Sequence, residues 1–429
     1  MAGRPYRVAV VGGGPAGAAI AILLASEGAD VVVFDDQPRD LVVGESLVPA
    51  IVPSLRRLGV EEAVKAISQE KPGVAFTGTF GHRVAFTFSR YRHRMVPYAY
   101  NVPRPGFEEV MRARAAAVGA RIVDHRVRIG RGAGDDPELV IDGESLEIAG
   151  WDGHPDLLID ATGRTRVGVR MLDIEARLGP RDDVAHFAHY SGFAWDEAPG
   201  FVLIGRVAGG WSWRIPLRDR ISVGIVVRRE TATQLGETPL ARLEAAIAAT
   251  PELAATVRGA TRVSDVATYS NYQLVTTRGF GRGWVAIGDA FGFVDPMLSP
   301  GTSVALRSAE DLAGVLAPAI HACREGRPVP SLDAGLAGYA ARMTDLLDAW
   351  MELVEYLYDG RMMALIKAGT EMVAERGDRI GNIMRDQAEM NVALLASGTA
   401  ITSRTRRAAL RFMGRYGLRG VSPAPLAID

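Results

Sequence analysis

The fold is decided near the start of the chain by the stretch Arg7–Gly17, which reads RVAVVGGGPAG. Its first half is apolar and predicts a buried parallel strand, and its second half has the spacing Gly-x-Gly-x-x-Gly at the start of a helix. Gly12 permits a tight turn, Gly14 lets the backbone approach a pyrophosphate, and Gly17 lets the helix pack closely on the strand. Together with Ala16, these glycines form the predicted dinucleotide-binding turn.

The residues that follow extend this turn into a strand–helix–strand unit. We expect a helix over residues 15–27 and a second strand over residues 30–34. The carboxylate of Asp35, at the end of that strand, is placed to accept a hydrogen bond from a ribose hydroxyl. The N-terminus of the helix supplies backbone N–H groups and the positive end of a dipole for the phosphates.

A second decisive stretch is Gly288–Gly301, which reads GDAFGFVDPMLSPG. It follows an apolar run at residues 284–287 that predicts a strand returning to the first sheet, and it precedes a helix expected at residues 302–316. The Asp289 carboxylate can accept from ribityl hydroxyls, while the helix N-terminus faces the electron-rich edge of a flavin. No second strand-associated Gly-x-Gly-x-x-Gly occurs in the sequence. The two stretches therefore predict FAD, with contacts from Gly288, Asp289 and Thr302.

The composition is that of a globular chain with almost no net charge. Its 429 residues are 48% hydrophobic and carry a net charge of −1, which gives no general attraction to nucleic acid or to anionic membranes. Residues 8–25 form an uncharged run, but glycines and a proline break it, so we expect no membrane span. A single cysteine, Cys323, excludes an internal disulfide framework and fits a reducing compartment. We therefore expect a cytoplasmic protein without a nucleic-acid partner.

The order of apolar segments predicts an α/β fold with an α+β second domain. A Rossmann-like FAD-binding domain is interrupted by an antiparallel-sheet substrate domain, and a C-terminal helical region follows. One buried strand of the first domain ends at Asp160 and is stopped by Gly163. The expected boundaries are 1–80, 100–175 and 276–325 for the FAD-binding domain, 81–99 and 176–275 for the substrate domain, and 326–429 for the helical region.

Four short motifs are distributed along the chain. They are Gly44–Pro49 (GESLVP), Lys71–Gly73 (KPG), Trp211–Pro216 (WSWRIP) and Phe293–Gly301 (FVDPMLSPG). On these motifs, the chain from Arg7 to Leu316 resembles the flavin-dependent halogenases and their relatives among the FAD-dependent aromatic monooxygenases. The second motif departs from the family pattern Phe-x-x-Lys-x-Gly, because Ser68 replaces the phenylalanine.

The resemblance implies a catalytic cycle with FAD and O2 and gives the motif residues their roles. In this family, reduced flavin and oxygen form a C4a-hydroperoxide, and the electrons come from NAD(P)H directly or through a separate flavin reductase. The resemblance implies no metal. The implied catalytic residues are Lys71, Pro296, Ser299 and Gly301, and the cofactor contacts beyond the two stretches above are Ser46, Arg104, Asp160 and Gly163.

Two departures from the family pattern bear on the reaction. In halogenases the halide is held by backbone N–H groups just after the serine of the Pro-x-x-Ser-x-Gly loop, which here means Pro300 and Gly301. Proline has no N–H, and the loss of one hydrogen bond to a charged group costs about 1.5–3 kcal/mol. Together with Ser68, this predicts oxygen transfer without halide, that is, hydroxylation of an electron-rich ring such as an indole or a phenol. Lys71 suits either reaction.

Other functions stay open. The first alternative is aromatic halogenation, the second is a flavin reductase similar to geranylgeranyl reductases, and the third is a non-catalytic FAD-holding protein. The whole chain also resembles the flavoprotein that hydroxylates a protein-bound tryptophan during quinone-cofactor maturation of quinohemoprotein amine dehydrogenase. The aromatic substrate is therefore a free molecule or a side chain in a polypeptide. The arginine-rich residues 404–419 could dock an acidic polypeptide, although a solvated helix face is the simpler explanation.

Overall fold

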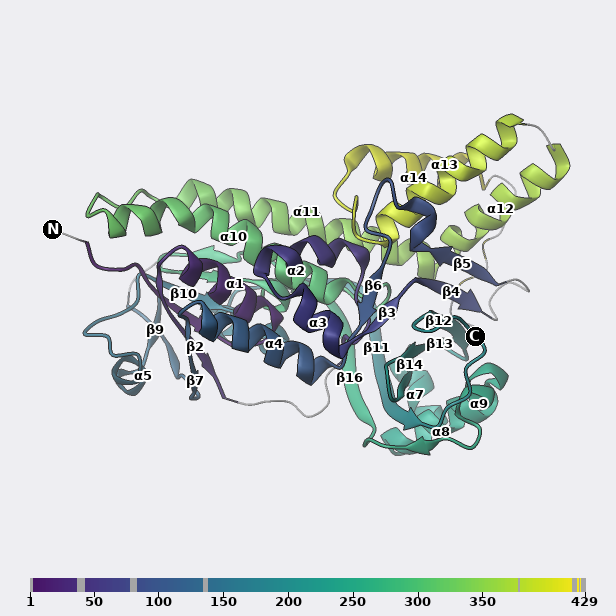
Figure 1. Cartoon of the computed structure of the whole chain (residues 1–429), viewed down its shortest axis with the longest axis horizontal. Helices are drawn as coiled ribbons and strands as arrows, with labels where there is room; N and C mark the ends of the chain where they lie inside the picture. Colours follow the sequence, from purple (N-terminus) through teal and green to yellow (C-terminus); the bar gives the residue numbers. More distant parts are fainter. Residues whose placement is uncertain are drawn as a thin grey trace.

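Two sheets and a helical region make up the protein, as the computed structural model in Figure 1 shows. The expected α/β class and the Rossmann-like nucleotide-binding domain are confirmed by the strand order and the connecting helices. The structure describes residues 3–36, 43–77, 83–133, 138–376, 379–418, 423 and 425.

The first sheet consists of buried and mostly parallel strands. Its order is β17-β18-β10-β1-β2-β7, and β17 at the edge runs antiparallel to its neighbour. Because β1 lies between β10 and β2, the loops that follow these strands open at one edge, where a doubly wound sheet binds its ligand. The strands are β1 (Arg7–Val11), β2 (Asp30–Asp35), β7 (Arg121–Asp124), β10 (Leu157–Asp160), β17 (Phe280–Gly281) and β18 (Trp284–Ala286).

Helix α1 (Pro15–Ser26) lies at the centre of this domain. It is buried along most of its length, because it packs against the sheet, against α4 (Arg104–Ala117) and against α10 (Pro300–Arg324). A Cβ on Gly17 would overlap the carbonyl oxygen of Gly12. The glycine therefore sets how closely α1 approaches the turn after β1, as the sequence predicts.

Prolines lie in the first turn of two helices at the site, and one of these helices begins earlier than residue 302, where the sequence predicts it. Helix α10 starts at Pro300, with Ser299 as its N-cap, because proline fits the first helical position, where no intrahelical hydrogen bond needs its N–H. Helix α4 starts at Arg104, three residues before the apolar stripe that begins at Phe107, and Pro105 lies in its first turn. Arg104 is therefore held by a helix and not by a loop.

The second sheet has nine strands and is antiparallel except where β12 pairs with β4 and runs parallel to it. Alternate residues of β13 point to opposite faces: Trp211 points to α11 and Arg214 points to α9. In Figure 1, α7–α9 lie on one side of this sheet and α12–α14 on the other. The strands are β4 (Gly73–Thr77), β5 (Val84–Thr87), β11 (Ala176–Ser191), β12 (Val202–Val207), β13 (Gly210–Pro216), β14 (Ile221–Arg228), β15 (Thr261–Arg262), β16 (Ala267–Thr276) and β19 (Gly292–Phe293).

The strand pairing differs from the expected domain boundaries at two places. β4 falls inside the range 1–80 but pairs with β12 and β5, so it belongs to the second sheet. β19 falls inside the range 276–325 but pairs with β16. The physical reason is that both segments are short extended strands whose hydrogen-bond partners lie in the second sheet: β4 lies between β12 and β5, and β19 lies at the edge beside β16. The loop that carries the predicted catalytic residues Pro296 and Ser299 therefore starts from the second sheet and ends in α10.

The C-terminal region is helical, as expected. α11 (Asp333–Tyr358) packs along α10 and reaches from the first sheet to the second, as Figure 1 shows. No helix in the described part of the chain is both long and apolar enough to cross a membrane. The other helices are η1 (Pro49–Ile51), α2 (Val52–Leu58), α3 (Glu61–Ile67), η2 (Phe88–Tyr91), α5 (Gly143–Ile148), η3 (Gly163–Thr165), α6 (Val167–Met171), α7 (Arg229–Leu235), α8 (Pro239–Ala249), α9 (Pro251–Val257), η4 (Gly288–Ala290), α12 (Arg361–Arg376), α13 (Arg379–Ala396) and α14 (Arg404–Tyr416).

Two small strand pairs complete the described structure. β3 (Gln69–Lys71) pairs with β6 (Ala99–Asn101), and β8 (Ile129–Arg131) pairs with β9 (Leu139–Ile141), both antiparallel. The first of these pairs holds Lys71 between the two large sheets, next to Ser46, which bridges to Asn101. A predicted catalytic residue is thereby fixed by backbone pairing on a short strand.

The glycine turn predicts unequal effects of two alanine substitutions. Gly17→Ala forces the backbone of α1 away from Gly12 and is expected to lower the free energy of unfolding by about 1–3 kcal/mol. Gly14→Ala is the matched control, because its Cβ would meet no atom within 4 Å and the backbone there has a negative φ. Thermal unfolding of the ligand-free variants measures the difference. Equal midpoints for both variants would contradict this account of the packing.

Candidate functional site

A cavity of about 840 Å³ lies between the two sheets and the helical region. Its wall includes the turn after β1, the loop after β10, the first turn of α10, the inner face of β13 and the end of α13. Of the predicted catalytic and cofactor-binding residues, three do not line it: Gly17, Asp160 and Gly288. Those that do are Gly12, Gly14, Ala16, Asp35, Ser46, Lys71, Arg104, Gly163, Asp289, Pro296, Ser299, Gly301 and Thr302.

The glycine turn forms one end of the cavity. Gly12 has a φ of +102°, and a Cβ there would lie 2.5 Å from the carbonyl oxygen of Ala161. Beside Gly14 the space is open, and Pro15 and Ala16 at the start of α1 line the same space. The first N–H groups of a helix have no intrahelical acceptor. This cradle fits the pyrophosphate of FAD, because an anion beside Gly14 would meet the backbone donors at the start of α1.

Asp35 lies at the end of β2, as expected, and an arginine holds it in place. Its carboxylate pairs with Arg112 of α4, and Nε of Arg112 also donates to the carbonyl oxygen of Gly13 at 3.5 Å. A Cβ on Gly13 would lie 2.6 Å from Oδ2 of Asp35, so the middle glycine of the triplet makes room for the carboxylate. Arg112 was not identified from the sequence, because no local pattern links it to Asp35.

Asp160 and Gly288 act from behind the cavity wall. The Asp160 carboxylate is fully buried and accepts from the backbone N–H groups of Thr162 at 3.0 Å and Gly168 at 2.8 Å. Burial raises the pKa of Asp160, and these hydrogen bonds oppose the rise. Gly288 has a φ of +56°, and a Cβ there would lie 2.9 Å from that of Ala16. Both residues shape loops of the site from behind its wall, and their contact with a cofactor stays a prediction.

Asp289 faces the cavity between two arginines. Burial raises the pKa of its carboxyl to about 6, and the positive charges of Arg164 and Arg104 act against the rise. Arg104 is itself anchored, because Nε pairs with Glu108 at 2.9 Å and Nη1 donates to the carbonyl oxygen of Val43 at 3.3 Å. Arg164 stacks 4.7 Å from the centroid of the Phe293 ring. This part of the wall offers one acceptor and two cations to a ligand.

The loop before α10 has a strained backbone. Leu298 has a φ of +64° and Ser299 a φ of +58°, a region that costs a residue other than glycine about 1–3 kcal/mol. The N–H of Ser299 donates to the carbonyl oxygen of Pro296 at 3.0 Å, which closes the turn. Pro300 then starts the helix, and the first-turn N–H groups of Gly301 and Thr302 have no intrahelical acceptor. The positive end of α10 therefore meets the cavity.

Lys71 is buried in the opposite wall, with a 4% exposed surface. Its ammonium donates to Oγ of Ser46 at 2.8 Å and to the carbonyl oxygen of Leu47 at 2.9 Å, and it lies 5.8 Å from the centroid of the Phe88 ring. Burial lowers the pKa of Lys71 to about 7. An ammonium has three N–H donors, so the two named bonds leave one for the cavity.

A buried acid–imidazole pair supports this wall and was not identified from the sequence. Nε2 of His189 lies 2.9 Å and 3.0 Å from the two carboxylate oxygens of Glu45, and both side chains are nearly inaccessible. Glu45 precedes Ser46, the hydrogen-bond partner of Lys71, and the carbonyl oxygen of Glu45 accepts from the N–H of Val102. The pair ties the segment beside Lys71 to β11 of the second sheet. Glu45 is the acid of the Gly-Glu motif, which was its one signal in the sequence.

The tryptophan pair of β13 lines the cavity with both rings on one face, as strand alternation predicts. Trp211 and Trp213 are almost fully buried, and their ring centroids are 5.7 Å apart. Nε1 of Trp211 donates to the hydroxyl of Tyr358 at 2.8 Å, and Nε1 of Trp213 donates to that of Ser222 at 3.1 Å. The rings therefore form a fixed apolar wall suited to an aromatic ligand.

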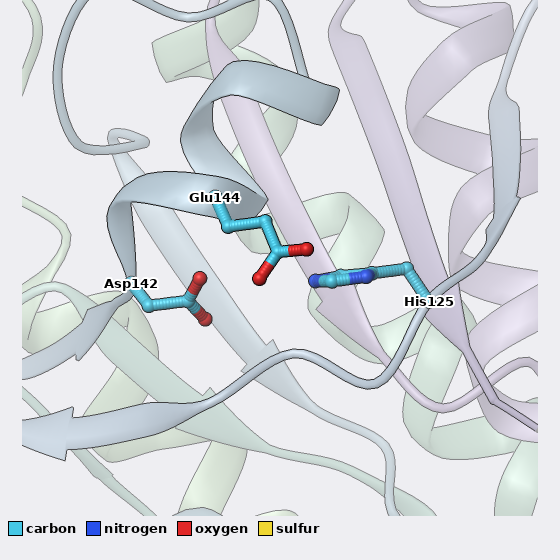
Figure 2. Close-up of side chains that lie close together, drawn as sticks. All are labelled: His125, Asp142 and Glu144. Carbon is cyan, nitrogen blue, oxygen red and sulfur yellow. The ribbon is translucent and has the colours of Figure 1, made fainter.

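One cluster of metal-binding residue types, shown in Figure 2, joins His125, Asp142 and Glu144 near the nucleotide end of the cavity. The Asp142 carboxylate is already used, because it caps α5 by accepting from the N–H of Ser145 at 3.0 Å and from the N–H of Arg128 at 2.8 Å. These hydrogen bonds hold the pKa of Asp142 at about 2 although burial opposes them. Helix capping therefore accounts for Asp142, while Nε2 of His125 lies 3.0 Å from Oγ of Ser145.

Two family models match the chain. A tryptophan halogenase model matches residues 90–326, and an FAD binding domain model matches residues 5–145. Both ranges contain cavity-lining residues. The tryptophan halogenase range includes the tryptophan pair and the loop before α10, and the FAD binding domain range includes the glycine turn.

Curated proteins with similar sequences carry halogenase names. The chain is 30% identical over 322 residues to a tryptophan 2-halogenase of Chondromyces crocatus, covering 71% of this chain and 59% of the relative. It is 27% identical over 354 residues to a 1H-pyrrole-2-carbonyl-(peptidyl-carrier protein) chlorinase of Pseudomonas fluorescens, covering 75% of this chain and 77% of the relative. The chain thus spans about three fifths of the length of the first relative.

Solved structures share the fold over nearly the whole chain. The flavin-dependent brominase Bmp2 superimposes with a TM-score of 0.77 at 21% identity, covering 97% of this chain and 99% of the brominase. The myxobacterial chondrochloren halogenase CndH gives a TM-score of 0.70 at 23% identity, covering 91% of this chain and 96% of CndH. The helical region is therefore part of the shared fold.

The buried lysine predicts a pH-dependent difference in stability. Folded Lys71 loses its proton near pH 7, while the unfolded chain keeps it up to about pH 10.5. The unfolded state then binds the extra proton between these values, so wild-type stability rises with pH across this window. Relative to Lys71→Met, which does not titrate, the ligand-free wild type should gain up to about 1.4 kcal/mol per pH unit. Denaturant unfolding at pH 6 to 10 measures this gain, and a difference independent of pH would contradict it.

Proposed function

Because this chain belongs to the tryptophan halogenase family, we propose that it is an FAD-dependent enzyme that halogenates an electron-rich aromatic substrate. The observation that carries the proposal is the cavity itself, which joins the glycine turn to Lys71, the tryptophan pair and the loop before α10. A cofactor site and a substrate wall are thereby continuous. Membership of the family also disfavours the reductase and non-catalytic alternatives.

The residues present fit FAD along the length of the cavity. Asp35 would accept from the adenosine ribose, the turn at Gly12–Gly14 would hold the pyrophosphate, and Asp289 would accept from the ribityl chain. When bound, FAD supplies activated oxygen, which requires O2 and electrons from NAD(P)H directly or through a separate flavin reductase. The start of α10 would face the flavin, where its dipole favours negative charge.

The same helix end offers a place for a halide. The free N–H groups of Gly301 and Thr302 and the positive end of the 25-residue α10 attract an anion. Pro300 takes one expected donor away, but it stands at the first helical position, where proline supports the helix that provides the remaining donors. The third N–H of Lys71 would donate to the oxidised halogen species, and the tryptophan pair would hold the ring.

This proposal replaces the hydroxylation predicted from the sequence as the leading function. The relatives named above are a halogenase and a chlorinase, and their names give the halogenation alternative the better support. Oxygen transfer without halide stays as the second candidate, because one specific observation favours it: Pro300 has no N–H at the position where a halide donor is expected. The site can deliver either oxygen or halogen from the same wall.

The substrate class follows from the wall and from the relatives. The apolar tryptophan face suits an indole, a phenol or a pyrrole, and one relative is named for a pyrrole carried by a peptidyl-carrier protein. We therefore include aromatic groups attached to a protein, among them a tryptophan side chain, beside free small molecules. With a single cysteine, we expect the enzyme to work in the cytoplasm.

The choice between the two reactions rests on halide dependence. We expect the purified enzyme with FAD, O2 and a flavin reductase to form chlorinated or brominated product from indole, phenol or pyrrole substrates when the halide is supplied. Mass spectrometry of the products measures this. Pro300→Thr restores the N–H and should raise the apparent affinity for halide roughly tenfold, corresponding to the one hydrogen bond gained. A gain of one oxygen in halide-free buffer, with no halogenated product in either variant, would establish hydroxylation instead.

We expect a substitution of Lys71 to impair product formation without weakening FAD binding. Lys71→Ala removes the ammonium from the substrate side of the cavity, and product formation should fall by at least a hundredfold, as is common when a charged catalytic donor is lost. FAD affinity should stay within a few fold, because the glycine turn is untouched. Lys65→Ala, on the exposed face of α3, is the control. Fluorescence titration with FAD and product yield give the two readings, and equal activity of both variants would exclude this role for Lys71.

A further inference from the structure

A buried chain of hydrogen bonds connects three separate parts of the protein. Nε1 of Trp211 in β13 donates to the hydroxyl of Tyr358 at 2.8 Å, and that hydroxyl lies 3.4 Å and 3.3 Å from the two carboxylate oxygens of Asp295. Exposure is 3% for Trp211, 7% for Tyr358 and 1% for Asp295. Tyr358 is the last residue of α11, and Asp295 directly precedes the strained loop. The chain therefore runs from the substrate wall, through the helical region, to the start of α10.

The surroundings keep Tyr358 as a neutral hydroxyl donor. Its pKa is raised well above the usual value by burial and by the negative charge of Asp295, against the positive charge of Arg181. The Arg181 guanidinium stacks 3.5 Å from the centroid of the Tyr358 ring and pairs with Asp183 at 2.6 Å. The cation fixes the ring, while the hydroxyl accepts from Trp211 and can only donate to Asp295. The direction of the hydrogen bonds is thus determined.

Asp295 links the Tyr358 hydroxyl to the loop before α10. Its Oδ1 accepts from the N–H of Met297 at 2.8 Å, which folds the backbone back just before Leu298 and Ser299. These two residues have positive φ values, and a conformation of that kind persists only where the surrounding structure over-determines it. The Tyr358 hydroxyl is one of the groups that fix the Asp295 carboxylate, and through it the shape of the loop.

We propose that Tyr358 is a positioning residue: through Asp295 it holds the loop from Pro296 to Gly301 in the strained form that sets Ser299 and the start of α10 against the cofactor. The helical region thereby sets the shape of the loop beside the cofactor. The Tyr358 hydroxyl itself does not contact the substrate. The inference deepens the proposed function and rests on it for the identity of the cofactor, but the hydrogen-bonded chain and the loop geometry do not depend on which reaction occurs.

The test compares two tyrosines of the same helix. Tyr358→Phe removes the hydroxyl that bonds Asp295, and Tyr339→Phe is the matched control, because Tyr339 is a fully buried residue of α11 whose hydroxyl donates to the carbonyl oxygen of Ala286 at 3.0 Å. Hydrogen–deuterium exchange of the amides at residues 297–302 is measured with and without FAD. We expect at least fivefold faster exchange in Tyr358→Phe and wild-type exchange in Tyr339→Phe. Unchanged exchange in Tyr358→Phe would overturn the proposal.

Two further measurements distinguish a loss of loop positioning from a general loss of structure. With FAD bound, the visible absorption spectrum of the flavin should shift in Tyr358→Phe, and the yield of product per O2 consumed should fall several-fold while the KM for substrate changes little. A matching loss in both tyrosine variants would instead mean a structural role for α11. If the wild type forms no product at all, the proposed function fails, but the exchange and the spectrum still decide the role of Tyr358.

A second variant covers the case in which Tyr358→Phe folds poorly. That substitution leaves Nε1 of Trp211 buried without an acceptor, whereas removing both partners of a hydrogen bond is close to neutral. The double variant Trp211→Phe, Tyr358→Phe therefore leaves no indole N–H without an acceptor and still lacks the bond to Asp295. Its loop should exchange as fast as that of the single variant, and Trp211→Phe alone should keep slow exchange. Slow exchange in the double variant would overturn the proposal.

Discussion

The close approach between α1 and the turn after β1 is the constraint on which the rest of the site depends. Gly17 and Gly12 meet without room for a side-chain carbon, and a Cβ on Gly17 would also lie 3.2 Å from that of Ala161. The loop after β18 joins the same contact, because Gly288 packs on Ala16. Loops from three parallel strands are therefore locked around one helix end. Since protein interiors are close-packed, a shift of one loop displaces the others.

Much of the nucleotide-binding half could be predicted, because its signals are local. The glycine spacing, the apolar strands and the acid at the end of β2 lie within one short segment, and each follows from backbone geometry. The same holds for the tryptophan pair, whose shared face follows from strand alternation. The start of α10 is less accurately predicted: the helix begins at Pro300 and not at residue 302, because proline fits the first helical position.

The partners of the site residues could not be predicted, because they come from distant segments of the chain. Arg112 pairs with Asp35, His189 with Glu45, and Tyr358 with Trp211. No periodicity or motif links such residues; only the folded sheets bring them together. The sequence also does not show that β4 and β19, which lie inside the ranges predicted for the FAD-binding domain, pair with the second sheet, since a short strand does not reveal its neighbour. Distant pairing thus decides how the local motifs are oriented.

The burial of α1 on nearly all sides has a consequence for how the protein is made. Its neighbour α10 starts at Pro300, so the ribosome releases α1 long before the helix that covers it. At about 5–20 residues per second, the interval is roughly 15–60 s. During that time α4 and the first strands can already pack against α1, but the face that α10 covers in the finished protein stays open. Nascent chains of this fold therefore expose part of the apolar surface of α1 until α10 has been synthesised.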